Sequence, residues 1–233
     1  MATYVLVAGA WLGAWVWDEV AEGLRAAGHA AHPLTLTGLA EKQGRPAGQQ
    51  THVQDIVDEV ERLDLRDVVL VGHSYSGIPV GQAAERIGDR LACVVFVDSN
   101  VPEDGKAFAA DAPSPHRARL VKSLEENGGC WPCLTADDCE GQGMTDDQVA
   151  RFLDGSTPHP GDSLLEPAVL KRPVGELPAT YVKCLLDGEE LMEEVAKALE
   201  SEHWELVWMD TGHWPMFSQP DELIRVLLDA HRP

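Results

Sequence analysis

Short apolar runs alternate with amphipathic stretches along the first hundred residues of the chain. The runs Tyr4–Val7 and Val68–Val71 contain no charged residue and are rich in valine, which is typical of strands buried on both faces. Stretches with helical spacing of apolar positions follow them, at Trp17–Ala27 and Ile78–Ile87. Because strand and helix alternate, the pattern predicts an α/β fold, with a mostly parallel sheet and helices on both of its faces.

The alternation stops between residues 101 and 178. Pro- and Gly-rich breaks separate three helix-like pieces there: Pro115–Asn127, Thr145–Asp154 and Ser163–Leu170. The pattern then resumes with two strand-like runs, Thr180–Leu186 and Trp204–Met209, and two helix-like stretches, Glu189–Leu199 and Pro220–Ala230. We therefore expect one core, formed by residues 1–100 and 179–233, and an insertion of residues 101–178 that caps the carboxyl edge of the sheet.

A candidate nucleophile stands directly after the strand-like run Val68–Val71. The next residues, Gly72 to Gly77, read GHSYSG and lead into a helix. At such a sharp strand-to-helix turn the Oγ of Ser74 projects from the end of the sheet, and the flanking residues must be small. Gly72 meets this requirement fully, whereas Ser76 stands where glycine is more usual. The alternative is an ordinary turn in which Ser74 is the helix N-cap. For His73 we expect only a packing role.

The partners of a serine nucleophile follow it in the expected order. His213 lies on a loop after the last strand-like run, where its imidazole can reach back to Ser74 as a general base. Asp187 follows the preceding strand and is our preferred acid, because that position can orient the imidazole. Asp98, at the end of the run Ala92–Val97, is the rival. A surface histidine and turn-forming aspartates are the alternatives without chemistry.

The loop after the first strand supplies the remaining part of such a site. Residues 8–15 read AGAWLGAW, and a loop of small residues can bring a backbone N–H beside the nucleophile. We expect the N–H groups of Ala10 and Tyr75 to form an oxyanion hole. A dinucleotide-binding loop is disfavoured, because the glycine spacing G-x-G-x-x-G is absent.

Taken together, these motifs resemble the α/β-hydrolase superfamily, in the esterase branch that includes plant salicylate methylesterases, hydroxynitrile lyases and related bacterial hydrolases. The matching segments are Tyr4–Trp17, Gly28–Glu41, Thr51–Ser99 and Thr180–Leu228. The resemblance implies the α/β-hydrolase fold, a triad of Ser74, Asp187 and His213, and the oxyanion donors named above.

The chain shows three departures from the proteins of that branch. Ala8 stands where a histidine often precedes the loop glycine, and Ser76 replaces the usual elbow glycine. The hydroxynitrile lyases carry threonine in place of the loop glycine and lysine after the catalytic histidine, whereas this chain has Gly9 and Trp214. The resemblance therefore argues against cyanide chemistry.

Composition agrees with a single enzyme domain. The 233 residues are 44% hydrophobic, which is far from a disordered composition, and the formal net charge is −21. Because a chain this acidic repels nucleic acid and anionic membranes, we expect neither of them as a partner. We see no export signal and no apolar run long enough to span a bilayer, and we expect a cytoplasmic protein. A homodimer remains open.

The five cysteines fall into two groups. Cys93 and Cys184 lie in strand-like runs, and the simplest interpretation is that they are buried apolar residues. Cys130, Cys133 and Cys139 lie in the expected cap, where a metal site, a disulfide and free thiols are all open. We favour free thiols, and we expect neither a metal nor an organic cofactor.

Aromatic and other apolar residues could line a cavity near the nucleophile: Trp11, Tyr75, Trp131, Phe152, Trp214 and Met216. Each could equally be an ordinary core residue. An apolar pocket favours a small hydrophobic or aromatic ester or lactone, cleaved through an acyl-enzyme. Two alternatives stay open. One is a non-hydrolytic lyase, cyclase or cofactor-free oxygen-using enzyme on the same scaffold, and the other is a low-turnover ligand-binding protein.

Overall fold

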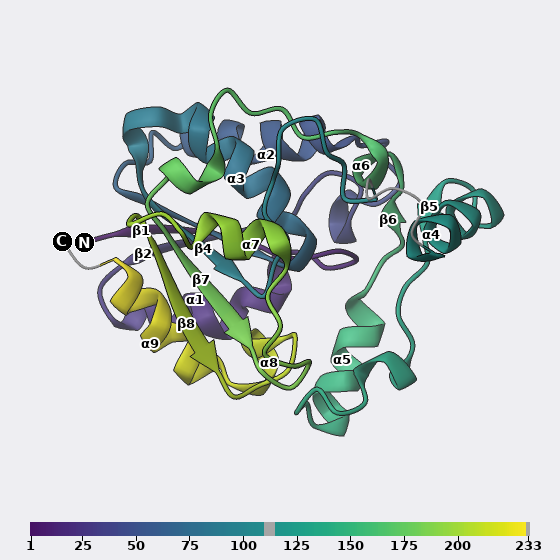
Figure 1. The fold of residues 1–233 in the computed structure, drawn as a ribbon. Helices are drawn as coiled ribbons and strands as arrows, with labels where there is room; N and C mark the ends of the chain where they lie inside the picture. The colour runs from purple at the N-terminus through teal and green to yellow at the C-terminus, as the bar shows by residue number, and fades with distance from the viewer. Residues whose placement is uncertain (110–114, 232–233) are drawn as a thin grey trace.

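A computed structural model describes residues 1–109 and 115–231 of the chain. Six strands form one sheet in the order β2-β1-β3-β4-β7-β8 (Figure 1). Their bounds are β1 (Thr3–Val7), β2 (Ala30–Leu34), β3 (Val68–His73), β4 (Leu91–Val97), β7 (Ala179–Cys184) and β8 (Trp204–Met209). All neighbouring pairs are parallel. The carboxyl ends of the strands therefore meet at one edge, where the loops can build a site.

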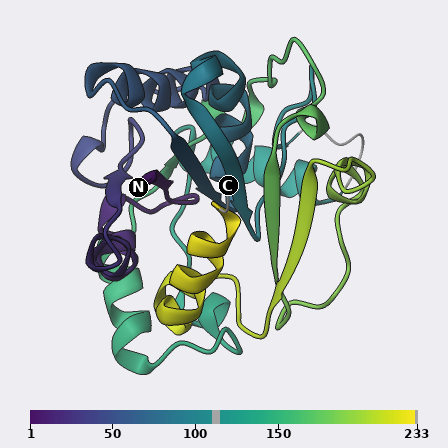
Figure 2. The same cartoon turned by 90° about the vertical axis from the view of Figure 1, so that its left-hand side faces the viewer.

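Helices cover both faces of this sheet (Figure 2). On one face lie α1 (Asp18–Ala26), α8 (Pro215–Ser218) and α9 (Pro220–Ala230). On the other lie α2 (Gln49–Arg62), α3 (Gly77–Ile87) and α7 (Glu193–Ala198). Short 3-10 helices η1 (Ala14–Trp17), η2 (Ala40–Lys42), η3 (Ser74–Ser76) and η4 (Gly88–Arg90) occur in the connections. The predicted α/β fold with a mostly parallel sheet is confirmed.

Side chains of each central strand alternate between the two faces. In β1, Val5 and Val7 join the buried cluster under α2 and α3, whereas Tyr4 and Leu6 join the cluster under α1 and α9. Successive residues of a strand point to opposite faces, so a strand covered on both sides is apolar along most of its length. This is the physical reason why the continuous apolar runs mark the strands of the sheet.

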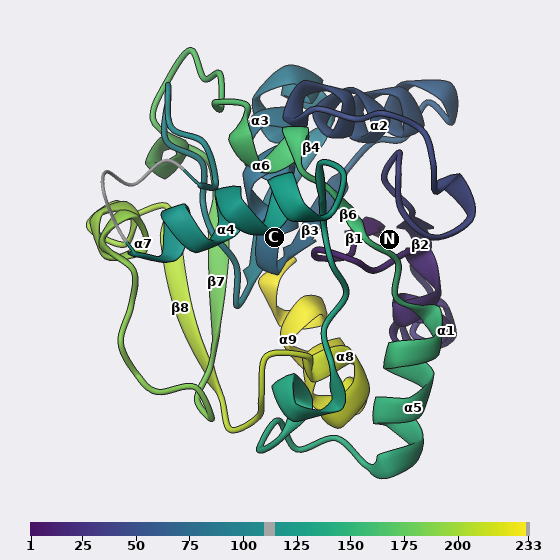
Figure 3. The same cartoon turned by 90° about the vertical axis from the view of Figure 1, so that its right-hand side faces the viewer.

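Between β4 and β7, the residues that the structure describes add no strand to the six-stranded sheet. We call residues 101–178 the cap segment. Its described elements are α4 (Pro115–Glu126), β5 (Cys130–Trp131), η5 (Ala136–Cys139), α5 (Asp146–Gly155), β6 (His159–Pro160), α6 (Asp162–Leu165) and η6 (Val174–Glu176). The short strands β5 and β6 pair with each other antiparallel. Figure 3 shows α4 and α5 on the side of the molecule facing away from the N-terminus and the end of α9.

Two helices are shorter than the sequence pattern predicts. The stretch Ser163–Leu170 forms only α6, since Glu166 precedes Pro167, and the residue before a proline is driven into the extended conformation. The helix expected at Glu189–Leu199 begins at Glu193, because Met192 is extended. In both places the backbone preference or local packing overrides the apolar spacing.

In the described ranges, no helix combines the length and the apolar character that crossing a membrane would need.

Candidate active site

The turn between β3 and α3 has the geometry of a nucleophile elbow. Ser74 has a φ of +54°, a left-handed conformation that is strained for a residue with a side chain. A Cβ on Gly72 would lie 3.1 Å from Gly77 Cα, and one on Gly77 would overlap the carbonyl oxygen of Asn100. The crowding explains why two glycines bracket this turn.

Ser76 fits the elbow although glycine is more usual there. Its side chain is buried, and Oγ accepts a hydrogen bond from the N–H of His73 at 2.9 Å. The same hydroxyl lies 2.8 Å from the carbonyl oxygen of Val7, to which it can donate. The hydroxyl therefore ties the elbow to β1, and the departure from glycine is compensated by hydrogen bonds.

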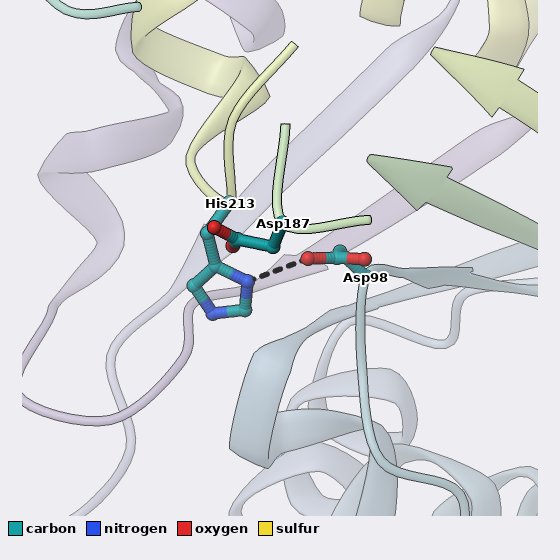
Figure 4. A group of neighbouring side chains, drawn as sticks. All are labelled: Asp98, Asp187 and His213. Carbon is teal, nitrogen blue, oxygen red and sulfur yellow. Dashed lines mark hydrogen bonds and ion pairs between the residues drawn. The ribbon is translucent and has the colours of Figure 1, made fainter. Parts of the chain in front are cut away.

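His213 lies between Ser74 and a carboxylate. Its Nε2 is 2.9 Å from Ser74 Oγ. Its Nδ1 is 2.7 Å from Asp98 Oδ2, on the other side of the ring (Figure 4). An ionised carboxylate can only accept, so Nδ1 carries the proton and Nε2 is left to accept from the serine hydroxyl. This is the tautomer that a general base for Ser74 requires.

Asp98 is held in place from β7. It follows β4 directly, with a φ of +41°, and its Oδ1 accepts from the N–H of Cys184 at 3.2 Å and from Lys183 Nζ at 3.1 Å. Burial alone would raise the pKa of Asp98. The hydrogen bond from His213 and the nearby charges of His213 and Lys183 outweigh burial and lower that pKa below its usual range. The carboxylate is thus kept ionised beside the imidazole.

The expected hydrogen bond between Asp187 and His213 is absent among the described residues, and that expectation is corrected. Asp187 is exposed, and its Oδ1 accepts from Gln142 Nε2 at 2.7 Å. After β7 ends, the N–H groups of Leu185 and Leu186 donate to the carbonyl oxygens of Met209 and Thr211, at the end of β8. The chain therefore stays beside β8 for two more residues, and Asp187 lies beyond the edge of the sheet. Figure 4 shows it beside His213 but not joined to the ring.

The ligand atoms of Asp98, Asp187 and His213 lie within 4.8 Å of one another, a spacing that a metal ion could bridge. A metal ion is not required to explain this cluster, because the imidazole Nδ1 of His213 is already hydrogen-bonded to Asp98.

The cysteines of the cap segment are free thiols, with Cys130 and Cys133 half-buried and Cys139 buried. That the protein works without a metal stays a prediction.

His73, which was expected only to pack in the core, has a specific hydrogen bond to the loop that carries His213. Its Nε2 donates to the carbonyl oxygen of His213 at 2.7 Å. Burial, helped by the nearby His213, lowers the pKa of His73 from 6.5 to about 3, so the ring is neutral. Its Nδ1 has no hydrogen-bond partner within residues 1–109 and 115–231 and faces Gly9. In the sequence, the only sign that His73 could hold the loop of His213 was its position next to Ser74.

The loop after β1 lies against the nucleophile. A Cβ on Gly9 would be 2.8 Å from Ser74 Cβ, so only glycine allows this approach. Trp11, with a φ of +67°, donates its N–H to His159 Nδ1 at 3.4 Å, and its carbonyl oxygen accepts from the N–H of Thr157 at 2.9 Å. The cap segment therefore fixes this loop. The oxyanion role of the N–H groups of Ala10 and Tyr75 stays a prediction.

Buried polar side chains behind the elbow were missed by sequence reasoning. Tyr75 Oη donates to His52 Nδ1 at 2.9 Å, and His52 Nε2 donates to the carbonyl oxygen of Thr37 at 2.8 Å. His159 Nε2 lies 2.8 Å from Ser163 Oγ. Burial lowers the pKa of both His52 and His159, so both rings are neutral. Because these residues come from distant segments, no local pattern marks them.

The structure divides the expected pocket residues between two places. The rings of Trp11 and Trp131 lie 4.2 Å apart, between the loop after β1 and the cap segment. The other three, Phe152, Trp214 and Met216, are buried together in the core cluster on the α1 and α9 face. Tyr75, the sixth expected residue, is buried with Trp11 in the core cluster on the α2 and α3 face. Phe152 of α5 packs against Phe217 of α8. Their contact with a substrate stays a prediction.

Comparisons with known proteins find similar sequences over part or all of the chain. The model of the alpha/beta hydrolase family matches residues 4–226. The carbendazim hydrolyzing esterase of Nocardioides sp. is 39% identical, over 48% of this chain and 48% of its own length. Methyl jasmonate esterase 1 of Vitis vinifera is 26% identical, over 96% of this chain and 94% of its own. The chain thus spans about half the length of the first relative and nearly all of the second.

Solved structures show the same fold. An extracellular alpha/beta-hydrolase from a Paenibacillus species, described as sharing structural and functional homology with tobacco salicylic acid binding protein 2, superposes with a TM-score of 0.88. Its sequence is 21% identical to this one, and the superposition covers 100% of both chains. A polyneuridine aldehyde esterase mutant gives a TM-score of 0.74 at 18% identity, with 99% of both chains covered. At these identities the likeness concerns the fold alone.

Proposed function

Because the chain belongs to the alpha/beta hydrolase family, we propose that it is a serine esterase that cleaves a small hydrophobic or aromatic ester or lactone. The observation that carries this proposal is the placement of His213 between Ser74 Oγ, at 2.9 Å, and Asp98 Oδ2, at 2.7 Å. Both ring nitrogens are engaged in the way that nucleophile activation requires. Relatives named as esterases support the same reaction class.

The proposed reaction proceeds in two steps. His213 Nε2 takes the proton of Ser74 Oγ while the oxygen attacks the ester carbonyl. The N–H groups of Ala10 and Tyr75 donate to the oxyanion that forms. Nε2 then returns the proton to the departing alcohol, and water, activated by the same nitrogen, hydrolyses the acyl-enzyme. No metal or organic cofactor is needed.

Asp98 takes the role of the acid in this proposal. It accepts the Nδ1 proton of His213 and so stabilises the charged imidazole that each step creates. Bonds from Lys183 and Cys184 hold the other carboxylate oxygen. Asp187 lacks such support, because its recorded hydrogen bond is to the side chain of Gln142.

The aromatic side chains near the loop after β1 support an apolar substrate. Trp131 lies 4.2 Å from the ring of Trp11 and 5.9 Å from the ring of Phe108, which is 5.8 Å from Tyr75. Aromatic neighbours of this kind suit a flat or alkyl group better than a sugar or a peptide. The net charge of −21 disfavours a polyanionic substrate.

Acyl-enzyme formation tests this proposal. Wild-type protein mixed with p-nitrophenyl acetate should release a burst of nitrophenol and gain an acetyl group on Ser74, seen by peptide mass spectrometry. Ser74→Ala should lose the burst and about 10³-fold or more in kcat while keeping its circular dichroism. Ser201→Ala, at the start of the connection to β8, is the matched control and should behave as wild type. Undiminished turnover in Ser74→Ala, or acetyl transfer elsewhere, would disprove the proposal.

A further inference from the structure

Gln142 stands in a tight turn of the cap segment, between η5 and α5. Its neighbours Gly141 and Gly143 have φ values of +75° and +72°, which favour glycine. The N–H of Gln142 donates to the carbonyl oxygen of Cys139 at 3.3 Å, and Cys139 is buried in the core cluster on the α1 and α9 face. The turn is therefore shaped by its glycines and anchored by a buried residue.

The side chain of Gln142 bridges two residues of the site. Its Oε1 accepts from the backbone N–H of His213 at 2.6 Å, and its Nε2 donates to Asp187 Oδ1 at 2.7 Å. A backbone N–H can only donate and an ionised carboxylate can only accept, so one orientation of the amide satisfies both bonds. The bridge is specific for a side chain with a donor and an acceptor at its end.

Gly212 allows this contact. A Cβ at that position would lie 2.7 Å from Gln142 Cα and would also overlap the carbonyl oxygen and Oε1 of Gln142. Any side chain on residue 212 would therefore displace the turn. The loop that carries His213 is thus fitted to the cap segment at the residue before the histidine.

The backbone of His213 is consequently held at both of its polar groups. His73 donates to its carbonyl oxygen from the buried end of β3, while Gln142 accepts its N–H from the cap segment. The first partner is part of the sheet core, whereas the second belongs to an insertion outside the sheet. The position of the imidazole therefore depends on how the cap segment is seated.

We propose that Gln142 is a positioning residue, through which the seated cap segment aligns His213 with Ser74 and holds Asp187 off the imidazole. This inference rests on the proposed esterase function. The catalytic groups remain Ser74 and His213, with Asp98 as the bonded carboxylate.

Removing the bridge tests this role. Gln142→Ala should lower kcat for p-nitrophenyl acetate about 10- to 100-fold with little change in KM, because misplacing a base by a fraction of an ångström slows the chemical step more than it weakens binding. In hydrogen exchange followed by NMR, the His213 amide should exchange faster. Gln148→Ala is the matched control. Gln148 also joins the cap segment to the core, through the carbonyl oxygen of Phe217, but does not touch His213.

A charge variant supplies a readout that loss of packing would not move. Gln142→Glu keeps an acceptor for the N–H of His213 but adds a negative charge and removes the donor to Asp187. The charged or titratable side chains facing the imidazole are Asp98 from β4, Asp187 after β7 and neutral His73 from β3, with Lys183 behind Asp98. A further negative charge favours the protonated imidazole, so the acidic limb of the kcat/KM profile should move to higher pH.

The outcomes separate this inference from the proposed function. Loss of activity in Ser74→Ala, together with wild-type kcat, amide exchange and pH profile in both Gln142 variants, would overturn the positioning role and leave the esterase standing. An active Ser74→Ala would overturn the esterase proposal itself. If Gln142→Ala loses its fold by circular dichroism, the pH profile of Gln142→Glu decides.

Discussion

At the scale of single residues, two carboxylates stand near one imidazole, and only one is bonded to it. Asp98 is within 2.7 Å of His213 Nδ1 and is held by Lys183, whereas Asp187 is exposed and bonded to Gln142. Distance to the ring nitrogen matters because the carboxylate must both select the tautomer and stabilise the imidazolium. Chain order alone favoured the other aspartate.

Substitution of each aspartate checks this assignment. Asp98→Asn should lower kcat by about 10²- to 10⁴-fold, since an amide no longer stabilises the charged ring and can reverse its tautomer. Asp187→Asn should cost far less, because the amide can still accept from Gln142. Steady-state rates on one ester, with folding checked by circular dichroism, give the ranking. The reverse order would show that Asp187 moves onto His213 during turnover.

At the scale of elements, the elbow depends on how closely α3 approaches the end of β4. A side chain on Gly77 would overlap the carbonyl oxygen of Asn100 and the side chain of Ser99. Backbone cannot yield as a flexible side chain can, so the turn and the residues after Asp98 must move apart. The same contact thus affects both the proposed nucleophile and its proposed acid.

We expect Gly77→Ala to destabilise the protein by about 1–3 kcal/mol through overpacking, and to lower kcat at the same time. Urea unfolding and steady-state kinetics measure the two effects. Gly175→Ala, where a Cβ would come no nearer than 3.8 Å to any atom, is the control and should change neither. A stable Gly77→Ala enzyme with full activity would mean that the elbow tolerates more space than its contacts indicate.

At the scale of the whole molecule, buried neutral histidines link folding to pH. Burial lowers the pKa of His52, His73 and His159, to about 3 for His73. An unfolded histidine titrates near 6.5. The unfolded chain therefore binds more protons below that pH, so stability is fully present above about pH 6.5 and is lost as pH falls toward the folded values. The lowered pKa of Asp98 extends the loss below about pH 4.

The urea concentration at the midpoint of unfolding should accordingly decrease as the pH is lowered from 7 to 5. His159→Gln removes one of these groups and should make the fall shallower, whereas His203→Gln, at an exposed position, should leave the slope unchanged. The net charge of −21 acts in the opposite direction, because acid relieves self-repulsion. A midpoint that rises on acidification would show that surface repulsion outweighs the buried histidines.

Local sequence determined most of the fold and pointed to the two ends of the proposed proton transfer. The runs at β1 and β3 are apolar at every position because parallel strands are covered on both faces, so their pattern can be read without knowing the partners. Ser74 and His213 were found because a small-residue elbow and a loop histidine after the last strand are local features. Helix ends set by a proline or by packing, as at Glu166 and Glu193, were less well predicted.

Only the tertiary structure decided which carboxylate meets His213 and what holds its backbone. Asp98 and Asp187 both follow strands that lie between β3 and β8 in the sheet, so the hydrophobic pattern alone does not separate them. The choice depends on where each loop turns after its strand, and on Lys183 and Gln142, which are 85 and 45 residues from the aspartates they bind. Such contacts depend on differences of a few ångströms between side chains distant in sequence, and hydrophobic periodicity carries no information about them.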